Sequence, residues 1–164
     1  MSVDLNGIAH IQLTVNHPDR CLPFWEKLCH FFGMQTLIKG EGVLYCIGSR
    51  TGILVREAPP EKRSISFDQN TAGLHHFCFR ARNREDIDAV HRFLVDELGA
   101  RIVHPPEDAS HFAPGYYSLL FEDPDGIRVE VNHVPGKGHL DSGGRLGPGG
   151  SGPANRYGSD GLTG

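Results

Sequence analysis

The chain has 164 residues, which suits one compact unit made of two half-size modules, because either half alone would bury too little apolar surface. Its formal net charge of -4 and the lack of a basic cluster argue against a nucleic-acid surface and favour a small-molecule partner. No apolar stretch approaches the roughly 20 residues of a membrane span, and the first residues lack the blocks of a signal peptide. We therefore expect a cytoplasmic protein with no membrane partner.

The first half of the chain predicts one helix between strands. Apolar and polar residues alternate over residues 8–15, which is the period of a half-buried strand. Pro18 is a favourable helix start, and Gly33 is a favourable stop for the apolar residues that recur at helical spacing between them. Three strands are then expected, at residues 34–39, 42–48 and 53–56.

The second half predicts the same order of elements. A strand is expected at 74–81 and a helix at 84–98, followed by strands near 100–104, 116–122 and 127–133. Gly7, His10 and Gly33 recur as Gly73, His76 and Gly99, each 66 positions later (76 minus 10). One supersecondary unit is therefore used twice.

These patterns set the expected boundaries of the modules. We expect a first module over residues 1–62, a second over 63–138, and a flexible tail over 139–164, where glycine is concentrated and apolar residues are few. Gly52 and Gly126 match at an offset of 74, so the second module carries about eight extra residues, which we expect in a loop at 104–115. The four cysteines lie in apolar runs and are expected to be buried, reduced thiols.

Three residues carry a candidate metal site. In the first strand of each module the large apolar residues face one way, which leaves His10 and His76 on the opposite face. Glu130 has the same parity in the last strand, so all three side chains can face one concave surface when the modules join. Two neutral imidazoles and a carboxylate hold a divalent metal and leave positions open for water or substrate.

On these residues the chain resembles the vicinal oxygen chelate superfamily, which holds glyoxalases, extradiol dioxygenases, fosfomycin-resistance enzymes, methylmalonyl-CoA epimerases and bleomycin-binding proteins. The resemblance rests on four motifs: residues 7–10, the helix end Phe32-Gly33, residues 73–76, and residues 114–117 leading into 123–130. It extends over about residues 5–138. It implies an α+β fold in which two βαβββ modules form an eight-stranded, open, curved mixed sheet around a cleft, with the helices on the outer face.

The resemblance also implies roles for further residues. The ligand positions of the family match His10, His76 and Glu130, while the fourth-strand position, often Glu in glyoxalases, matches Arg56. A guanidinium cannot ligate a cation, so Arg56 is expected to hold an anionic group of the substrate. Further candidates are His111 as an acid/base, Tyr116 or Tyr117 as a phenol, and Gln12 and Phe112 as substrate contacts; strand parity lets only one of the two tyrosines into the cleft.

A set of three ligands, with no carboxylate as the fourth, looks most like the extradiol dioxygenases. This resemblance favours Fe(II) and leaves Zn, Ni or Mn as alternatives. The match is incomplete, because Leu120 stands where those enzymes carry a tyrosine and the chain is half the length of a four-module dioxygenase. Lyase or isomerase chemistry of the glyoxalase type is the other branch. The alternative function is a metal-free protein of the bleomycin-resistance type that sequesters a ligand. Family members also suggest a homodimer.

Overall fold

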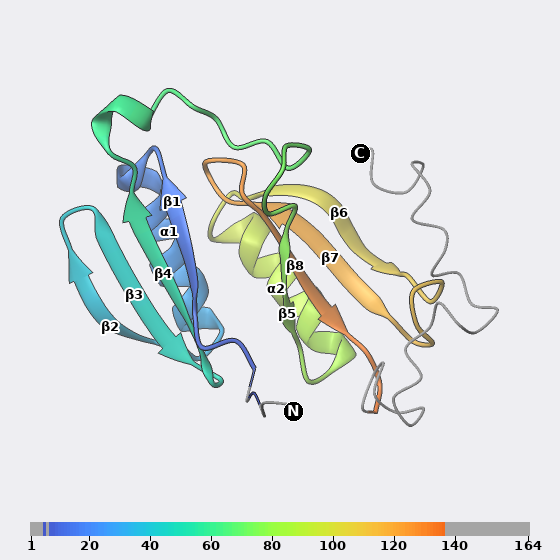
Figure 1. The fold of residues 1–164 in the computed structure, drawn as a ribbon. Helices are drawn as coiled ribbons and strands as arrows, with labels where there is room; N and C mark the ends of the chain where they lie inside the picture. The colour runs from blue at the N-terminus through green and yellow to red at the C-terminus, as the bar shows by residue number, and fades with distance from the viewer. Residues whose placement is uncertain (1–4, 6, 137–164) are drawn as a thin grey trace, which may run out of the picture. The chain divides into compact units, whose positions relative to one another are not determined.

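A computed structural model of the protein describes residue 5 and residues 7–136, so the expected tail at 139–164 lies outside the described residues. The described part contains two modules with the same element order (Figure 1). The first comprises β1 (Ile11–Val15), α1 (Pro18–Phe31), β2 (Gln35–Gly40), β3 (Val43–Gly48) and β4 (Thr51–Glu57), followed by a 3-10 turn (Pro60–Lys62). The second comprises β5 (Phe77–Arg80), α2 (Arg84–Asp96), β6 (Arg101–Asp108), β7 (Tyr117–Glu122) and β8 (Arg128–His133).

Each module forms its own four-stranded mixed sheet. The strand order is β1-β4-β3-β2 in the first sheet and β5-β8-β7-β6 in the second. The pairs β1/β4 and β5/β8 are parallel, and all other neighbours are antiparallel. In each module the helix packs on one face of its own sheet (Figure 1). The expected α+β class and the two βαβββ modules are confirmed, with the eight strands divided four and four.

The alternation of apolar residues explains which faces are buried. In β1, Leu13 and Val15 are buried while Gln12 and Thr14 are exposed, as a strand with one packed face requires. The helix α1 packs a stripe of buried residues against this sheet. Trp25 lies within this stripe and has no exposed surface. In the second module α2 buries residues of the same kind, and its first turn is fixed by Asp86, which accepts the Asn83 backbone N–H at 3.0 Å.

Two features of the strands differ from the sequence prediction. The strands β1 and β5 begin at Ile11 and Phe77, so the two histidines predicted to lie within them immediately precede them instead. The strand β6 runs on to Asp108, through the first five residues of the segment predicted to be a loop at 104–115. Its two prolines are accommodated because β6 is an edge strand and its pairing with β7 shifts register twice in this region.

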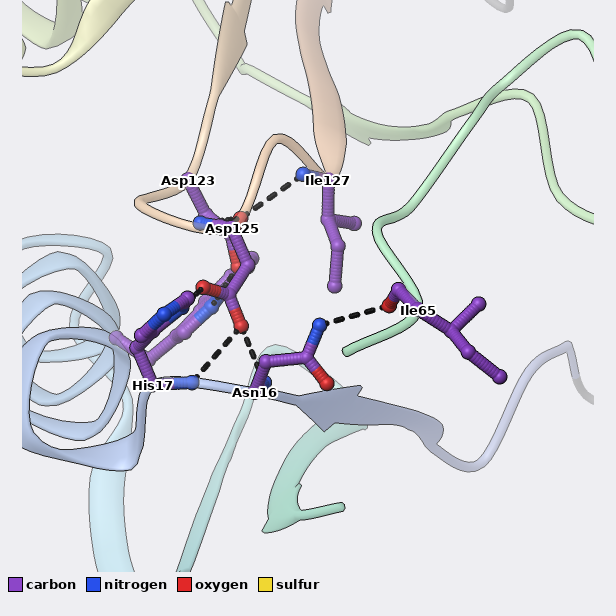
Figure 2. Close-up of polar contacts among 7 residues, drawn as sticks. Asn16, His17, Ile65, Asp123, Asp125 and Ile127 are labelled. Atoms are coloured by element: carbon purple, nitrogen blue, oxygen red, sulfur yellow. Dashed lines mark hydrogen bonds and ion pairs between the residues drawn. The ribbon is translucent and has the colours of Figure 1, made fainter. Parts of the chain in front are cut away.

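The turn between β7 and β8 packs within the first unit of the chain. Among the described residues, 7–68 and Asp123–Ile127 form one compact unit, and 69–122 and 128–136 form the other. The Asp125 carboxylate accepts the backbone N–H groups of Asn16 and His17, and contacts the His17 ring (Figure 2). Burial would raise the pKa of Asp125, but these hydrogen bonds outweigh it and hold the pKa below its usual value.

Asp123 fixes the turn from inside the same unit. Its carboxylate accepts the backbone N–H groups of Asp125 and Ile127, each at 2.9 Å, and the Trp25 indole N–H at 2.9 Å. Asp123 is only 4% exposed, so three donors surround a buried acceptor. The turn has five residues between Glu122 and Arg128, against two between Gly48 and Thr51 in the first module. Part of the extra length of the second module therefore lies here, outside the predicted 104–115 segment.

The cysteine prediction is correct for three of the four residues. All four are free thiols, and Cys21, Cys29 and Cys46 are buried, whereas Cys78 is exposed. Cys78 lies on the face of β5 opposite to the buried Phe77, which is why an apolar neighbourhood in sequence did not bury it. No helix among the described residues is long and apolar enough to cross a membrane.

Candidate functional site

Two of the three predicted metal ligands meet in the second unit. His76 immediately precedes β5, and Glu130 lies on the neighbouring strand β8, where it pairs with Cys78. The Nε2 atom of His76 lies 3.1 Å from Oε2 of Glu130. The His76 side chain is 32% exposed and that of Glu130 is 14% exposed, so the pair is partly shielded but reachable from solvent.

The second carboxylate oxygen of Glu130 has its own partner. The Tyr116 hydroxyl donates to Oε1 at 2.6 Å and accepts the Asn132 Nδ2–H at 2.8 Å. Burial raises the pKa of Tyr116, and so does its bond to the carboxylate, so the phenol stays protonated and remains a donor. Burial would also raise the pKa of Glu130, but hydrogen bonds from His76, Tyr116 and Ser118 outweigh it and lower the pKa. Glu130 is therefore an anion at neutral pH.

His75 lies against His76 on the side away from Glu130. The two Nδ1 atoms are 2.7 Å apart, so one ring donates a hydrogen bond to the other, and the rings meet nearly at right angles. The sequence suggested that His75 points toward the helix layer or is partly exposed, and that it was only a rival to His76 as a ligand. His75 is half-buried just before β5, in line with the second of these expectations, and its ring also contacts that of His76, which was not expected.

The loop between β6 and β7 brings three of the other predicted residues together. The His111 and Phe112 ring centroids are 4.0 Å apart, and those of Phe112 and Tyr116 are 5.5 Å apart. Tyr117 faces the other way: its hydroxyl donates to Asp88 of α2 at 2.8 Å, and the Arg84 guanidinium lies over its ring. The alternation of the two tyrosines along the chain thus directs Tyr116, and not Tyr117, toward Glu130.

In the first unit, two of the three predicted substrate contacts, Gln12 and Arg56, line one open pocket. Its volume is about 430 Å³, and its lining includes Gln12 and Thr14 of β1 and Arg56 of β4. Thr14 and Arg56 are register partners on the parallel strands. Glu57 also lines the pocket, but its carboxylate is paired with Arg63 at 2.5 Å. No carboxylate among the described residues forms an ion pair with Arg56, whose side chain is exposed.

The strand register shows which residue of the first module corresponds to Glu130, and it differs from the residue expected from the sequence. Cys78 pairs with Glu130 in the second sheet, and the matching residue of the first module, Gln12, pairs with Leu54. Leu54, and not Arg56, is therefore the residue of the first sheet that stands where Glu130 stands in the second. Arg56 lies two residues further along β4, on the same face. The first module thus offers His10 but no carboxylate at that position.

The third predicted ligand, His10, belongs to the first unit. It is exposed just before β1, and its ring meets the Tyr45 ring edge-on with a centroid distance of 6.4 Å. Within the described ranges, no group of three His, Cys, Asp or Glu side chains gathers closely enough to hold a metal ion. The His76–Glu130 pair brings together two of the three predicted ligands and is called the candidate half-site below; the set of three stays a prediction.

Sequence reasoning missed the outer partners of this pair. No role at the site was predicted for Asn132 or His75. A signal for each is present in the sequence. Asn132 is two residues from Glu130, so it lies on the same face of the strand, and an adjacent pair of histidines before a strand can place one ring behind the other.

Comparison with known proteins agrees with this fold. A candidate glyoxalase of Bacillus halodurans superposes with a TM-score of 0.68 at 24% identity, covering 79% of this chain and 96% of that one. A lactoylglutathione lyase of Agrobacterium tumefaciens gives a TM-score of 0.56 at 24% identity, covering 79% and 94%. The uncharacterised protein YqjT of Bacillus subtilis strain 168 is 23% identical over 122 residues, which are 74% of this chain and 94% of YqjT.

These identities speak for the fold alone. Membership rests instead on a match of residues 7–131 to the sequence model of one superfamily, and this range spans both modules, the His76–Glu130 pair and the Arg56 pocket. The superfamily includes metal-dependent enzymes and non-enzymatic binding proteins. The chain belongs to the glyoxalase/bleomycin resistance protein/dioxygenase superfamily.

Proposed function

We propose that the protein is a metalloenzyme that binds a small, anionic, oxygenated substrate on a divalent metal ion. The observation that carries this proposal is the approach of His76 Nε2 to Glu130 Oε2 at 3.1 Å, with the carboxylate ionised. Two donor atoms that each bind one ion at about 2.1 Å, at angles of about 90–109°, lie roughly 3.0–3.4 Å apart. The pair therefore fits neighbouring positions around a single ion.

The donor chemistry fits as well. Imidazole nitrogen and carboxylate oxygen suit iron, nickel, zinc and manganese, and two such ligands leave room for a third, for which the repeat selects His10. A bound ion would act as a Lewis acid toward negative charge on the substrate oxygens. The Tyr116 hydroxyl holds one oxygen of Glu130 and leaves the other for the ion. His111 is the candidate group for moving a proton, and Phe112 is a candidate wall of the site.

The first experiment is a metal analysis of the wild-type protein. The protein is purified anaerobically without a His-tag, and its metal content is measured by mass spectrometry before and after reconstitution. We expect close to one ion per chain. Iron would indicate dioxygenase chemistry, and nickel, zinc or manganese would indicate a lyase or isomerase such as the lactoylglutathione lyase fold relative. No bound metal after reconstitution would contradict the proposal and favour the metal-free binding protein.

Arg56 gives the proposal its substrate class. An exposed guanidinium without a carboxylate partner, in a pocket that also offers Gln12 and Thr14, suits a carboxylate or phosphate group. Replacement by glutamine removes a charge-assisted hydrogen bond worth about 1.5–3 kcal/mol, so we expect about 10- to 150-fold weaker binding of inorganic phosphate or acetate. Chemical-shift titration of backbone amides in β1 and β4 measures this affinity.

The matched control is Arg50→Gln, which removes the same charge from another exposed position of the first module. Arg56→Lys keeps the charge but loses the two-pronged geometry, and should bind anions with intermediate affinity. Equal anion affinities in Arg56→Gln and Arg50→Gln would show that the pocket recognises no anion. The assembly state is proposed to be a homodimer on family grounds, and light scattering of the purified protein measures it.

A further inference from the structure

We infer that His75 is a positioning residue for the metal site: its Nδ1 atom accepts a hydrogen bond from Nδ1–H of His76 and thereby directs the Nε2 lone pair of His76 toward the ion. The inference rests on the proposed function. Its basis is geometric, since the two Nδ1 atoms are 2.7 Å apart while Nε2 of His76 points to Glu130. In the metal-free protein Nε2–H of His76 donates to Glu130, and Nδ1 of His76 accepts from His75. An ion at Nε2 would take the place of that proton, and Nδ1–H of His76 would then donate to His75.

A neutral imidazole can carry its proton on either nitrogen, and only the bare nitrogen can bind a metal. A histidine that ligates a metal through one nitrogen commonly donates the other N–H to an acceptor, which fixes both the tautomer and the ring orientation. In this protein the acceptor nearest to His76 Nδ1 is the ring of the preceding residue. Because this acceptor is a neutral imidazole and not a carboxylate, it adds no negative charge next to His76.

The surroundings of His75 suit this role. Its Nε2 atom is buried and has no hydrogen-bond partner among the described residues, so its Nδ1 makes the only polar contact of the ring within that part of the chain. Because the polar contact of the His75 ring is with His76, the predicted metal ligand, we infer that this contact holds His76 in place. On the opposite side, Tyr116 holds Glu130, and Asn132 in turn holds the Tyr116 hydroxyl.

Two substitutions of His75 separate positioning from packing. His75→Leu keeps an apolar volume but removes the acceptor, and His75→Asn returns an acceptor oxygen near the former position of Nδ1. Cobalt(II) is the probe, and its dissociation constant is measured anaerobically by optical titration. We expect roughly 10- to 100-fold weaker binding in His75→Leu, as for the loss of other outer partners of metal ligands. We expect His75→Asn to recover most of that loss.

A second readout follows the hydrogen bond itself. In the cobalt form of the wild-type protein, the Nδ1–H proton of His76 should give a shifted NMR signal that exchanges slowly with water, because His75 accepts it. The signal should exchange faster in His75→Leu and slow again in His75→Asn. A residue that only filled space would leave this exchange unchanged. Thermal unfolding of the metal-free variants shows whether each one folds.

The outcomes distinguish the two proposals. If the wild-type protein does not bind cobalt, the proposed function fails and this inference fails with it. If the wild-type protein binds cobalt and His75→Leu binds it equally well with unchanged proton exchange, the inference alone is overturned. If both substitutions weaken binding equally and both fold, the effect comes from packing, and the positioning role is also overturned.

Discussion

Replacing Glu130 with glutamine is expected to weaken divalent metal binding by more than the 10- to 100-fold that loss of an outer partner typically costs. The amide has the same shape but no negative charge, and a neutral amide oxygen is a much poorer ligand for a divalent cation than a carboxylate. The substitution also removes the ionised acceptor of the Tyr116 hydroxyl. Competition with a chromophoric chelator measures the affinity for cobalt(II) or zinc(II).

The matched control is Glu107→Gln, which removes the same charge from an exposed position on β6. Because an exposed carboxylate outside the site contributes only a screened, long-range attraction to a cation, this variant should keep nearly wild-type affinity. His76→Gln should resemble Glu130→Gln, since each removes one half of the pair. Wild-type affinity in Glu130→Gln would refute the candidate half-site, even if the protein contained metal.

The largest effect on stability is expected for Trp25→Ala. Trp25 has no exposed surface, and truncation of a buried aromatic residue typically lowers the free energy of unfolding by about 3–5 kcal/mol. Its indole N–H also donates to the buried Asp123 carboxylate, so the substitution leaves that acceptor with one donor fewer. Urea unfolding followed by circular dichroism measures the difference.

Trp25→Phe separates the two contributions, because it keeps an aromatic ring and loses only part of the volume and the N–H donor. We expect a loss of about 1–3 kcal/mol, mostly from the unpaired acceptor. If Asp123→Asn is combined with Trp25→Phe, the two losses should not add, because both act on one hydrogen bond. Additive losses would show that the bond between Trp25 and Asp123 does not stabilise the protein.

Much of the fold could be predicted because it depends on local periods. The alternation of apolar residues in β1 and their helical spacing around Trp25 can be recognised from a short stretch of sequence. The repeat of His10 as His76 then extended each prediction to the second module. The placement of Glu130 on the face of His76 follows from the same alternation. These elements lie within one or two residues of the predicted bounds, except where strands begin late or, in β6, end late.

The remaining features depend on segments far apart in sequence. Asp123 and Asp125 were recognisable only as turn residues, since nothing local indicates that their carboxylates accept hydrogen bonds from Trp25, Asn16 and His17. The equivalence of Leu54 to Glu130 depends on the register of the parallel pairs β1/β4 and β5/β8, whose strands are far apart in sequence. The contact of His75 with His76 depends on where β5 begins.

The turn between β7 and β8 also affects the order in which the chain can fold during synthesis. The Asp123 carboxylate that accepts the Trp25 N–H is 98 residues further along the chain. At about 5–20 residues per second, a ribosome needs roughly 5–20 s to make that stretch. During this interval the helix and strands made first lack the acceptor for a buried indole and the carboxylate that binds the start of α1. The module that is translated first is therefore completed only when the second is nearly made.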